Sequence, residues 1–206
     1  MEFDISKIKF SVRDREKGIV LPSQLTEELA EDIGIHTGDG CLCLCNKWKT
    51  CHEFCYSFNA NEKSYLEYAL NLKKSLYNIS KIRLYSKGGE IGFKFYSIAI
   101  VNFYKTYFSI PVGKKTNISV PNIIRNCSNS RIIAGYLRGI IDTDFSLILR
   151  RKYGKVYPSF EGTFSSIKLV NSLAELFDIL KIKNNILHYD KYDKRTGNTY
   201  SSNQII

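Results

Sequence analysis

The stretch LRGIIDTDF (residues 137–145) places Asp142 and Asp144 directly after an apolar run that contains a glycine. A buried carboxylate without a partner is costly, so two acids at the end of such a run require an explanation. The chain repeats the arrangement: a shift of 105 residues aligns Asp39, in the stretch GIHTGDG, with Asp144. The sequence therefore predicts two copies of one structural unit.

Small residues recur at every fourth position in both copies, a spacing that is typical of one face of a helix. They are Ala30, Gly34 and Gly38 in the first copy and Gly135, Gly139 and Thr143 in the second. A glycine inside a helix costs about 1 kcal/mol, so this recurrence favours a specific contact. We expect the two smooth faces to pack together and to bring Asp39 and Asp144 to the same place.

The segments between the motifs predict one order of elements in each copy. After the first motif helix, we expect a hairpin, a helix, a hairpin and a closing helix, at 41–60, 62–79, 81–97 and 98–108. After the second, we expect a hairpin, a helix and a hairpin, at 146–164, 167–182 and 183–205. The predicted fold class is α+β, with two pseudo-symmetric αββαββ(α) repeats, residues 1–112 and 113–206, joined at a central two-helix interface. Ser23 or Thr26 should cap the first helix.

The second copy has no counterpart of the closing helix at 98–108. Apolar surface on its sheet should therefore remain uncovered, and soluble monomers seldom leave large patches of this kind open. We expect one of three results: pairing with a second copy as a homodimer, capping by the linker at 109–122, or lower stability in the second half.

The charge of the chain suggests a polyanionic partner. The 206 residues are 44% hydrophobic, carry a formal net charge of +10 and have a sequence pI near 9.2. No run of apolar residues is long enough to span a membrane, and the first residues lack a signal-peptide pattern, so we expect a cytoplasmic protein. The positive charge favours nucleic acid as the partner. The alternative is that the charge only keeps the surface soluble.

The two motifs, GIHTGDG (34–40) and GIIDTDF (139–145), resemble those of the single-chain LAGLIDADG homing endonucleases. The resemblance implies that the motif helices form the interface between halves and that the sheets form a saddle on double-stranded DNA. It also implies that Asp39 and Asp144 bind a divalent metal, Mg²⁺ or another cation such as Mn²⁺. Phe145 replaces the closing glycine of the family motif, which leaves the geometry around Asp144 open.

Electrostatics favours a metal role for the two acids independently. Two carboxylates at adjacent helix ends repel each other unless a cation lies between them. Mg²⁺ prefers a few carboxylates together with water and substrate phosphates, and such ions activate water and stabilise the leaving oxygen in phosphodiester hydrolysis. The alternative is that Asp39 and Asp144 cap their helices or lie in solvated turns, which the helix dipole disfavours.

Basic residues lie at or near the turn of each predicted hairpin, where they could contact phosphates. The candidate DNA-binding residues are Lys47, Lys49, Arg83, Lys87, Arg150, Arg151, Lys152, Lys155, Lys191, Lys194 and Arg195. Lys94 is a further candidate for the catalytic site, because members of the resembled family often place a lysine on this strand near the scissile phosphate. An ordinary role on the groove surface is the alternative for Lys94.

Five of the six cysteines lie within CLCLCNKWKTCHEFC (residues 41–55). A zinc site is one reading, but Cys41, Cys43 and Cys45 alternate along one strand and cannot all reach one ion. We therefore expect half-buried thiols on the groove face of the sheet.

The leading functional hypothesis is a site-specific double-strand DNA endonuclease of the homing type that hydrolyses phosphodiesters with a metal ion. The alternative is a catalytically inactive DNA-binding protein on the same fold, acting as a regulator, as an intron-splicing cofactor or as a degenerate endonuclease. The two acids favour the first hypothesis. Three features favour the second: Phe145, the lack of a lysine in the second copy that matches Lys94, and the missing helix.

Overall fold

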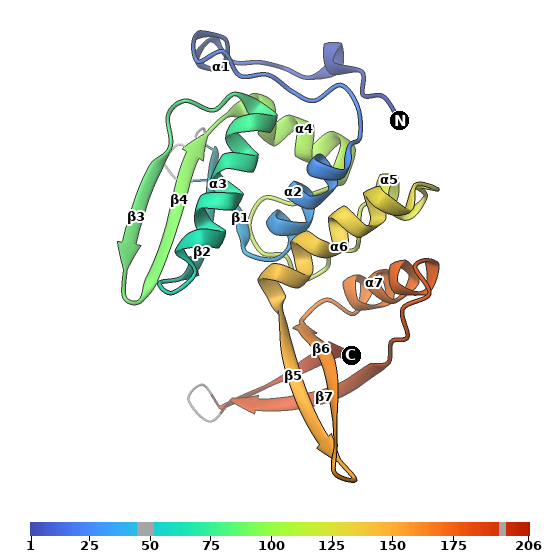
Figure 1. Cartoon of the computed structure of the whole chain (residues 1–206). Helices are drawn as coiled ribbons and strands as arrows, with labels where there is room; N and C mark the ends of the chain where they lie inside the picture. The colour runs from blue at the N-terminus through green and yellow to red at the C-terminus, as the bar shows by residue number, and fades with distance from the viewer. Residues whose placement is uncertain (45–51, 194–196) are drawn as a thin grey trace.

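Two antiparallel four-stranded sheets lie on either side of a central pair of helices (Figure 1). The computed structural model describes residues 1–44, 52–193 and 197–206. The strand orders are β1-β2-β4-β3 in the first sheet and β5-β6-β8-β7 in the second. The shared order confirms the predicted α+β fold of two repeats. No helix in these ranges is both long and apolar enough to cross a membrane.

The elements follow the predicted order. The first half contains η1 (Ile5–Lys7), α1 (Val12–Glu16), α2 (Glu27–Thr37), β1 (Gly40–Leu44), β2 (His52–Asn59), α3 (Lys63–Tyr77), β3 (Arg83–Lys87), β4 (Glu90–Tyr96) and α4 (Ile98–Phe108). The second contains α5 (Asn122–Arg125), α6 (Ser130–Asp144), β5 (Phe145–Lys152), β6 (Lys155–Phe164), α7 (Ile167–Ile179), β7 (Ile186–Asp193) and β8 (Asn198–Ile205). Thr26 caps α2, since its side chain accepts a hydrogen bond from the Leu29 amide at 3.2 Å.

The glycines of the two motifs let α2 and α6 pack backbone against backbone. A Cβ atom on Gly139 would lie 2.7 Å from the amide nitrogen of Ile35, and one on Gly135 would lie 2.5 Å from the carbonyl oxygen of Glu27. Separations this short are not tolerated between a side chain and a fixed backbone. The predicted contact between the small-residue faces is therefore confirmed.

A buried polar cluster ties α2 to α3 and α4 in the first half. Asp32 and Lys73 form an ion pair at 2.5 Å, and both side chains are fully buried. The Tyr77 hydroxyl donates to Asp32 at 2.7 Å, and Lys73 donates to the Tyr104 hydroxyl at 2.8 Å. These contacts compensate the two charges that burial removes from water.

The first sheet is covered by helices on its inner face, whereas the second is only partly covered. In the first half, Phe54 and Phe95 are buried in the core with α4. On the corresponding face of the second sheet, Leu147, Leu149 and Phe160 are 59%, 63% and 53% exposed. The prediction that apolar surface on the second sheet is uncovered is confirmed for these residues.

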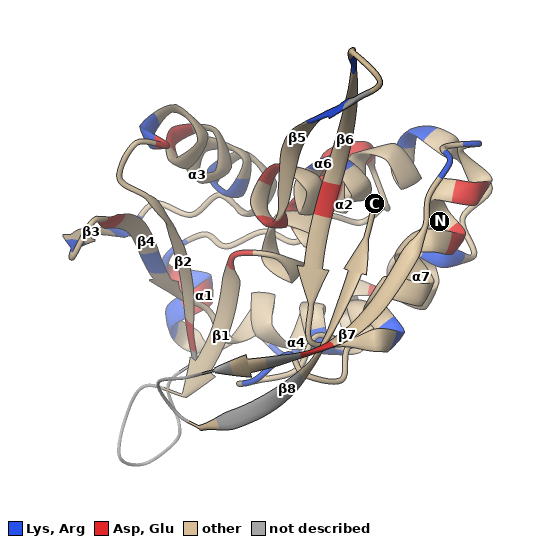
Figure 2. Ribbon diagram, turned by 90° about the horizontal axis from the view of Figure 1, so that it is seen from below, with Lys and Arg blue, Asp and Glu red and all other residues tan. Residues whose placement is uncertain are grey.

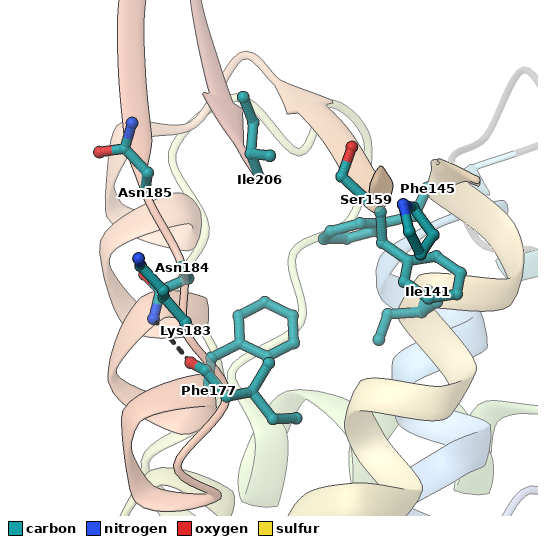
Figure 3. A pocket seen from close by; sticks show the side chains of 11 residues that line it. Ile141, Phe145, Ser159, Phe177, Lys183, Asn184, Asn185 and Ile206 are labelled. Carbon is teal, nitrogen blue, oxygen red and sulfur yellow. Dashed lines mark hydrogen bonds between the residues drawn. The ribbon is translucent and has the colours of Figure 1, made fainter. Parts of the chain in front are cut away.

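A cavity of about 540 Å³ lies beneath the uncovered strands (Figure 3). Apolar side chains dominate its walls, among them Ile141, Phe145, Phe177 and Ile206, and the amide side chains of the segment before β7 close one side. Pairing of two copies through this surface stays a prediction.

We expect amide protons of β5 to exchange with solvent at least about tenfold faster than those of β1, the matching edge strand of the first sheet. The reason is that Leu42 of β1 is buried, while Leu147 and Leu149 of β5 are exposed. Hydrogen exchange followed by mass spectrometry, at a concentration where the protein is monomeric, measures this. Equal protection of the two strands would mean that the exposed apolar surface of β5 has no energetic consequence.

Candidate acid pair and nucleic-acid interface

The two predicted metal acids meet at the base of the helix pair. Asp39 lies in the turn between α2 and β1, and Asp144 is the last residue of α6. A Cβ atom on Gly38 would lie 3.2 Å from Oδ2 of Asp144, which places that carboxylate beside the turn that carries Asp39. The parallel packing of α2 and α6 thus brings both carboxylates to one end of the interface, between the two sheets.

Burial and mutual repulsion disfavour the state in which both Asp39 and Asp144 are ionised. Burial, and then the charge of Asp144, raise the pKa of Asp39 to about 7. Burial also raises the pKa of Asp144, and nearby Lys115 opposes this change. Asp142, by contrast, points outward and is exposed, so it is a neighbour of the pair and not part of it. Such a pair is stabilised by any cation that enters the site.

The donor set fits a hard divalent cation. Among the described residues, no three or more His, Cys, Asp or Glu side chains gather as a metal cage. Asp39 and Asp144 would supply two carboxylate oxygens and leave the other positions to water and phosphate, which is the arrangement that Mg²⁺ favours. Glycine at position 38 allows the two helix ends to approach this closely, because a Cβ atom there would lie 2.7 Å from the Cβ of Thr143.

Phe145 does not disturb the second motif. Its backbone is extended, with φ −106° and ψ 152°, so no glycine is required at this position. Its ring packs at 5.7 Å from that of Phe164 and at 6.2 Å from that of Phe177. In the first motif, a Cβ on Gly40 would lie 2.6 Å from the Cα of His36, so that position does require glycine. The difference between the motifs has a local packing reason.

Lys115 is a member of the site that sequence reasoning missed. Its Nζ donates hydrogen bonds to the carbonyl oxygens of His36 at 3.2 Å, Thr37 at 2.7 Å and Gly38, which end α2. The sequence places Lys115 in the linker next to another lysine, Lys114, and no motif distinguishes the two.

Lys94 lies on the open face of the first sheet. The strand register aligns it with Cys55, and Cys55 with Cys41, two residues after Asp39. Its Nζ donates to Oε1 of Glu53 at 3.1 Å, and this contact raises the pKa of Lys94. The side chain is 32% exposed, so the cation is held on the face that the two sheets present together.

The second sheet carries a similar pair. Arg150 contacts Glu161 at 2.5 Å, and Gln204 donates to the other carboxylate oxygen at 2.8 Å. The register of β5 and β6 places Lys155 on the same face as Arg150. Arg151 alternates to the opposite face, opposite Val156, so we do not retain it among the groove residues.

The remaining candidate cations fall in two groups. Arg83 and Lys87 share the face of Lys94, because β3 aligns Arg83 with Lys94 and Lys87 with Glu90. Lys152 and Lys191 lie on β5 and β7, and only their strand positions are described. Lys47, Lys49, Lys194 and Arg195 lie outside the described residues. Figure 2 shows Lys and Arg at the tips of the β3–β4 and β5–β6 hairpins.

The described cysteines of the cluster lie on the open face. Cys41 pairs with Cys55 across β1 and β2, and Cys43 pairs with Glu53. Cys41 is exposed, while the thiols of Cys43 and Cys55 are half-buried. The expected groove-face position is confirmed for Cys41 and Cys43. Cys45 lies outside the described residues.

Comparison with solved structures gives the fold a precedent. No protein-family model matches the sequence, and no curated protein does. A complex of the homing endonuclease I-DmoI with DNA and Ca has a TM-score of 0.58 and 14% identity, over 87% of this chain and 81% of that chain. A variant of I-DmoI bound to nicked target DNA in the presence of Mn has a TM-score of 0.61 and 14% identity, over 88% and 89%. The I-DmoI complex with DNA and Mn has a TM-score of 0.56 and 16% identity, over 88% and 90%. The resemblance to LAGLIDADG homing endonucleases is thereby confirmed for the fold.

Proposed function

We propose that this protein is a site-specific double-strand DNA endonuclease of the homing type, which hydrolyses phosphodiester bonds with a divalent metal ion. The observation that carries the proposal is the pair Asp39 and Asp144, brought together between two basic sheets by a backbone-to-backbone helix contact. The DNA complexes of I-DmoI, which has the same fold, support it.

The sheets would hold the DNA along their open faces. In this arrangement the halves 1–112 and 113–206 each contact one part of the recognition site. Cations at the hairpin tips contact phosphates and fix the register, while side chains on the strands meet base edges. Arg83, Lys87 and Lys155 are the described tip and strand cations to which we assign phosphate contacts.

Asp39 and Asp144 would hold the metal, Mg²⁺ or Mn²⁺, against the scissile phosphate. A bound divalent ion supplies an activated water and a counter-charge for the leaving oxygen. The carboxylates themselves would act as ligands of the ion and would take no proton in the reaction. Lys94, on β4, would donate to a phosphate oxygen in exchange for its present contact with Glu53.

The experiment that tests the proposal is selection of bound duplexes from a random DNA library, followed by incubation of the selected duplex with protein and Mg²⁺. We expect two nicks that yield a double-strand break, and none when EDTA replaces Mg²⁺. Tight binding without cleavage in Mg²⁺ or Mn²⁺ would favour a DNA-binding protein that has lost catalysis. Failure to select any duplex at low salt would contradict DNA recognition itself.

Binding to the selected duplex should weaken steeply with salt, because each phosphate contact releases a counter-ion. Lys155→Gln should weaken binding at low salt and reduce the slope of log affinity against log salt by about 1. Lys168→Gln, an exposed lysine on α7 behind the second sheet, is the matched control and should leave the slope unchanged. Fluorescence anisotropy across a salt series measures both, and equal slopes for all three proteins would contradict the assignment of Lys155.

A further inference from the structure

The linker between the halves is anchored beside the acid pair. The amide of Gly113 donates to the carbonyl oxygen of Leu42 on β1 at 2.7 Å. A few residues later, Ser166 donates to the carbonyl oxygen of Ile118 at 2.5 Å, which fixes the linker to the start of α7. The intervening residue Lys115 is therefore held in place from both sides.

Lys115 directs its ammonium group at the negative end of α2. Three carbonyl oxygens at this end, those of His36, Thr37 and Gly38, accept hydrogen bonds from Nζ. A helix C-terminus carries a partial negative charge and unsatisfied carbonyl groups, so a lysine there is favourable. Three accepted bonds use the whole donor capacity of an ammonium group, so the side chain has one defined position.

The same ammonium group lies beside both acids. It donates to the carbonyl oxygen of Gly38, the residue before Asp39, and a Cβ atom on Gly38 would lie 3.2 Å from Oδ2 of Asp144. Its positive charge lowers the pKa of Asp39 and of Asp144, whereas burial raises both. The two acids belong to different halves, and Lys115 belongs to the segment that joins them.

We propose that Lys115 is a built-in counter-ion of the acid pair: it balances the two carboxylates without metal and thereby sets how tightly a divalent cation binds. This inference rests on the proposed metal site and deepens it. A fixed positive charge beside the site repels an incoming cation, so affinity for the ion is lowered in the absence of DNA. Phosphate, which brings further negative charge, then offsets that repulsion, so the ion is retained chiefly when DNA is bound.

The test compares how tightly Mn²⁺ binds to the DNA-free protein when the positive charge at position 115 is present and when it is removed. Electron paramagnetic resonance of free Mn²⁺ measures the binding. Lys115→Gln removes the charge but keeps an amide donor for the α2 carbonyl groups. It should bind Mn²⁺ at least about tenfold more tightly than the unaltered protein. Lys115→Arg keeps the charge and should bind Mn²⁺ as the unaltered protein does. Lys114→Met, at the exposed neighbouring lysine, is the matched control and should change nothing.

Thermal unfolding of the same proteins separates the counter-ion role from a structural one. If Lys115 only caps α2, the Gln variant should melt earlier and bind Mn²⁺ equally or more weakly, and this result would overturn the inference. Asp39→Asn should abolish Mn²⁺ binding at the acid pair and is the negative control. Binding of Mn²⁺ to none of the proteins would overturn the metal site and the inference together, whereas binding that is unaltered by Lys115→Gln overturns the inference alone.

Discussion

Replacement of Asp39 by asparagine should reduce cleavage of the selected duplex by at least about a thousandfold, the scale on which loss of a charge-stabilising group acts. Asparagine has nearly the same shape but cannot supply the anionic oxygen that a divalent ion requires. Affinity for the duplex should be unchanged or higher, because the variant removes one negative charge from the DNA-facing site. Single-turnover cleavage and anisotropy measure the two effects separately.

The folded protein should tolerate this change well. The pKa of Asp39 is raised to about 7 in the folded state, so the folded protein holds a proton there that the unfolded chain releases above about pH 4. The contribution of Asp39 to stability therefore falls as pH rises from about 4 to 7, and ionised Asp39 is a cost above that range. At pH 8 the variant should melt at the same temperature as the unaltered protein or higher.

Asp142→Asn is the matched control, since Asp142 is exposed and only two residues from Asp144. It should cleave at nearly the unaltered rate. Equal loss of cleavage in the Asp39 and Asp142 variants would show that the acid pair has been assigned wrongly.

Replacement of Lys73 by methionine should destabilise the protein by about 3–5 kcal/mol, because it leaves the buried carboxylate of Asp32 without its partner. Both side chains are fully buried and 2.5 Å apart, so water cannot replace the lost contact. Methionine preserves most of the volume, which limits the effect of a cavity. Denaturant unfolding measures the change.

Two companion variants make the result specific. Lys74→Met, at the exposed neighbour on α3, should change the free energy of unfolding by less than about 0.5 kcal/mol. The double variant Asp32→Asn with Lys73→Met should recover part of the loss, because no buried charge is then left alone. A double variant less stable than either single one would contradict this account of the cluster.

Most of the fold could be predicted from the duplicated motif. The spacing of Gly34, Gly135 and Gly139 predicted a close helix contact, and the segments between the motifs predicted the order of helices and hairpins in both halves. These features can be predicted from the sequence because they depend on local periodicity and on glycine, a residue that is unusual inside a helix. The position of the acid pair followed from the same contact.

The rest of the site depended on contacts between distant segments. Lys115 stands in a linker that shows no periodicity, and only the fold brings its ammonium group to α2. Strand alternation already predicts that Arg150 and Arg151 lie on opposite faces, but only the fold brings Glu161 to Arg150. The pairing of Lys94 with Glu53 links two strands that are 41 residues apart in the chain. A single sequence holds no signal for such pairs.

The contact between α2 and α6 also bears on how such a protein can evolve. Main-chain atoms make much of the contact between α2 and α6. This contact therefore does not depend on which side chains the sheets carry. After an ancestral duplication, each sheet could therefore acquire its own surface residues without weakening the contact between α2 and α6. A symmetric ancestor would be matched to a palindrome. In the proposed complex with DNA, two sheets that differ, one with Lys94 and Glu53 and the other with Arg150 and Glu161, would suit a target whose two sides differ.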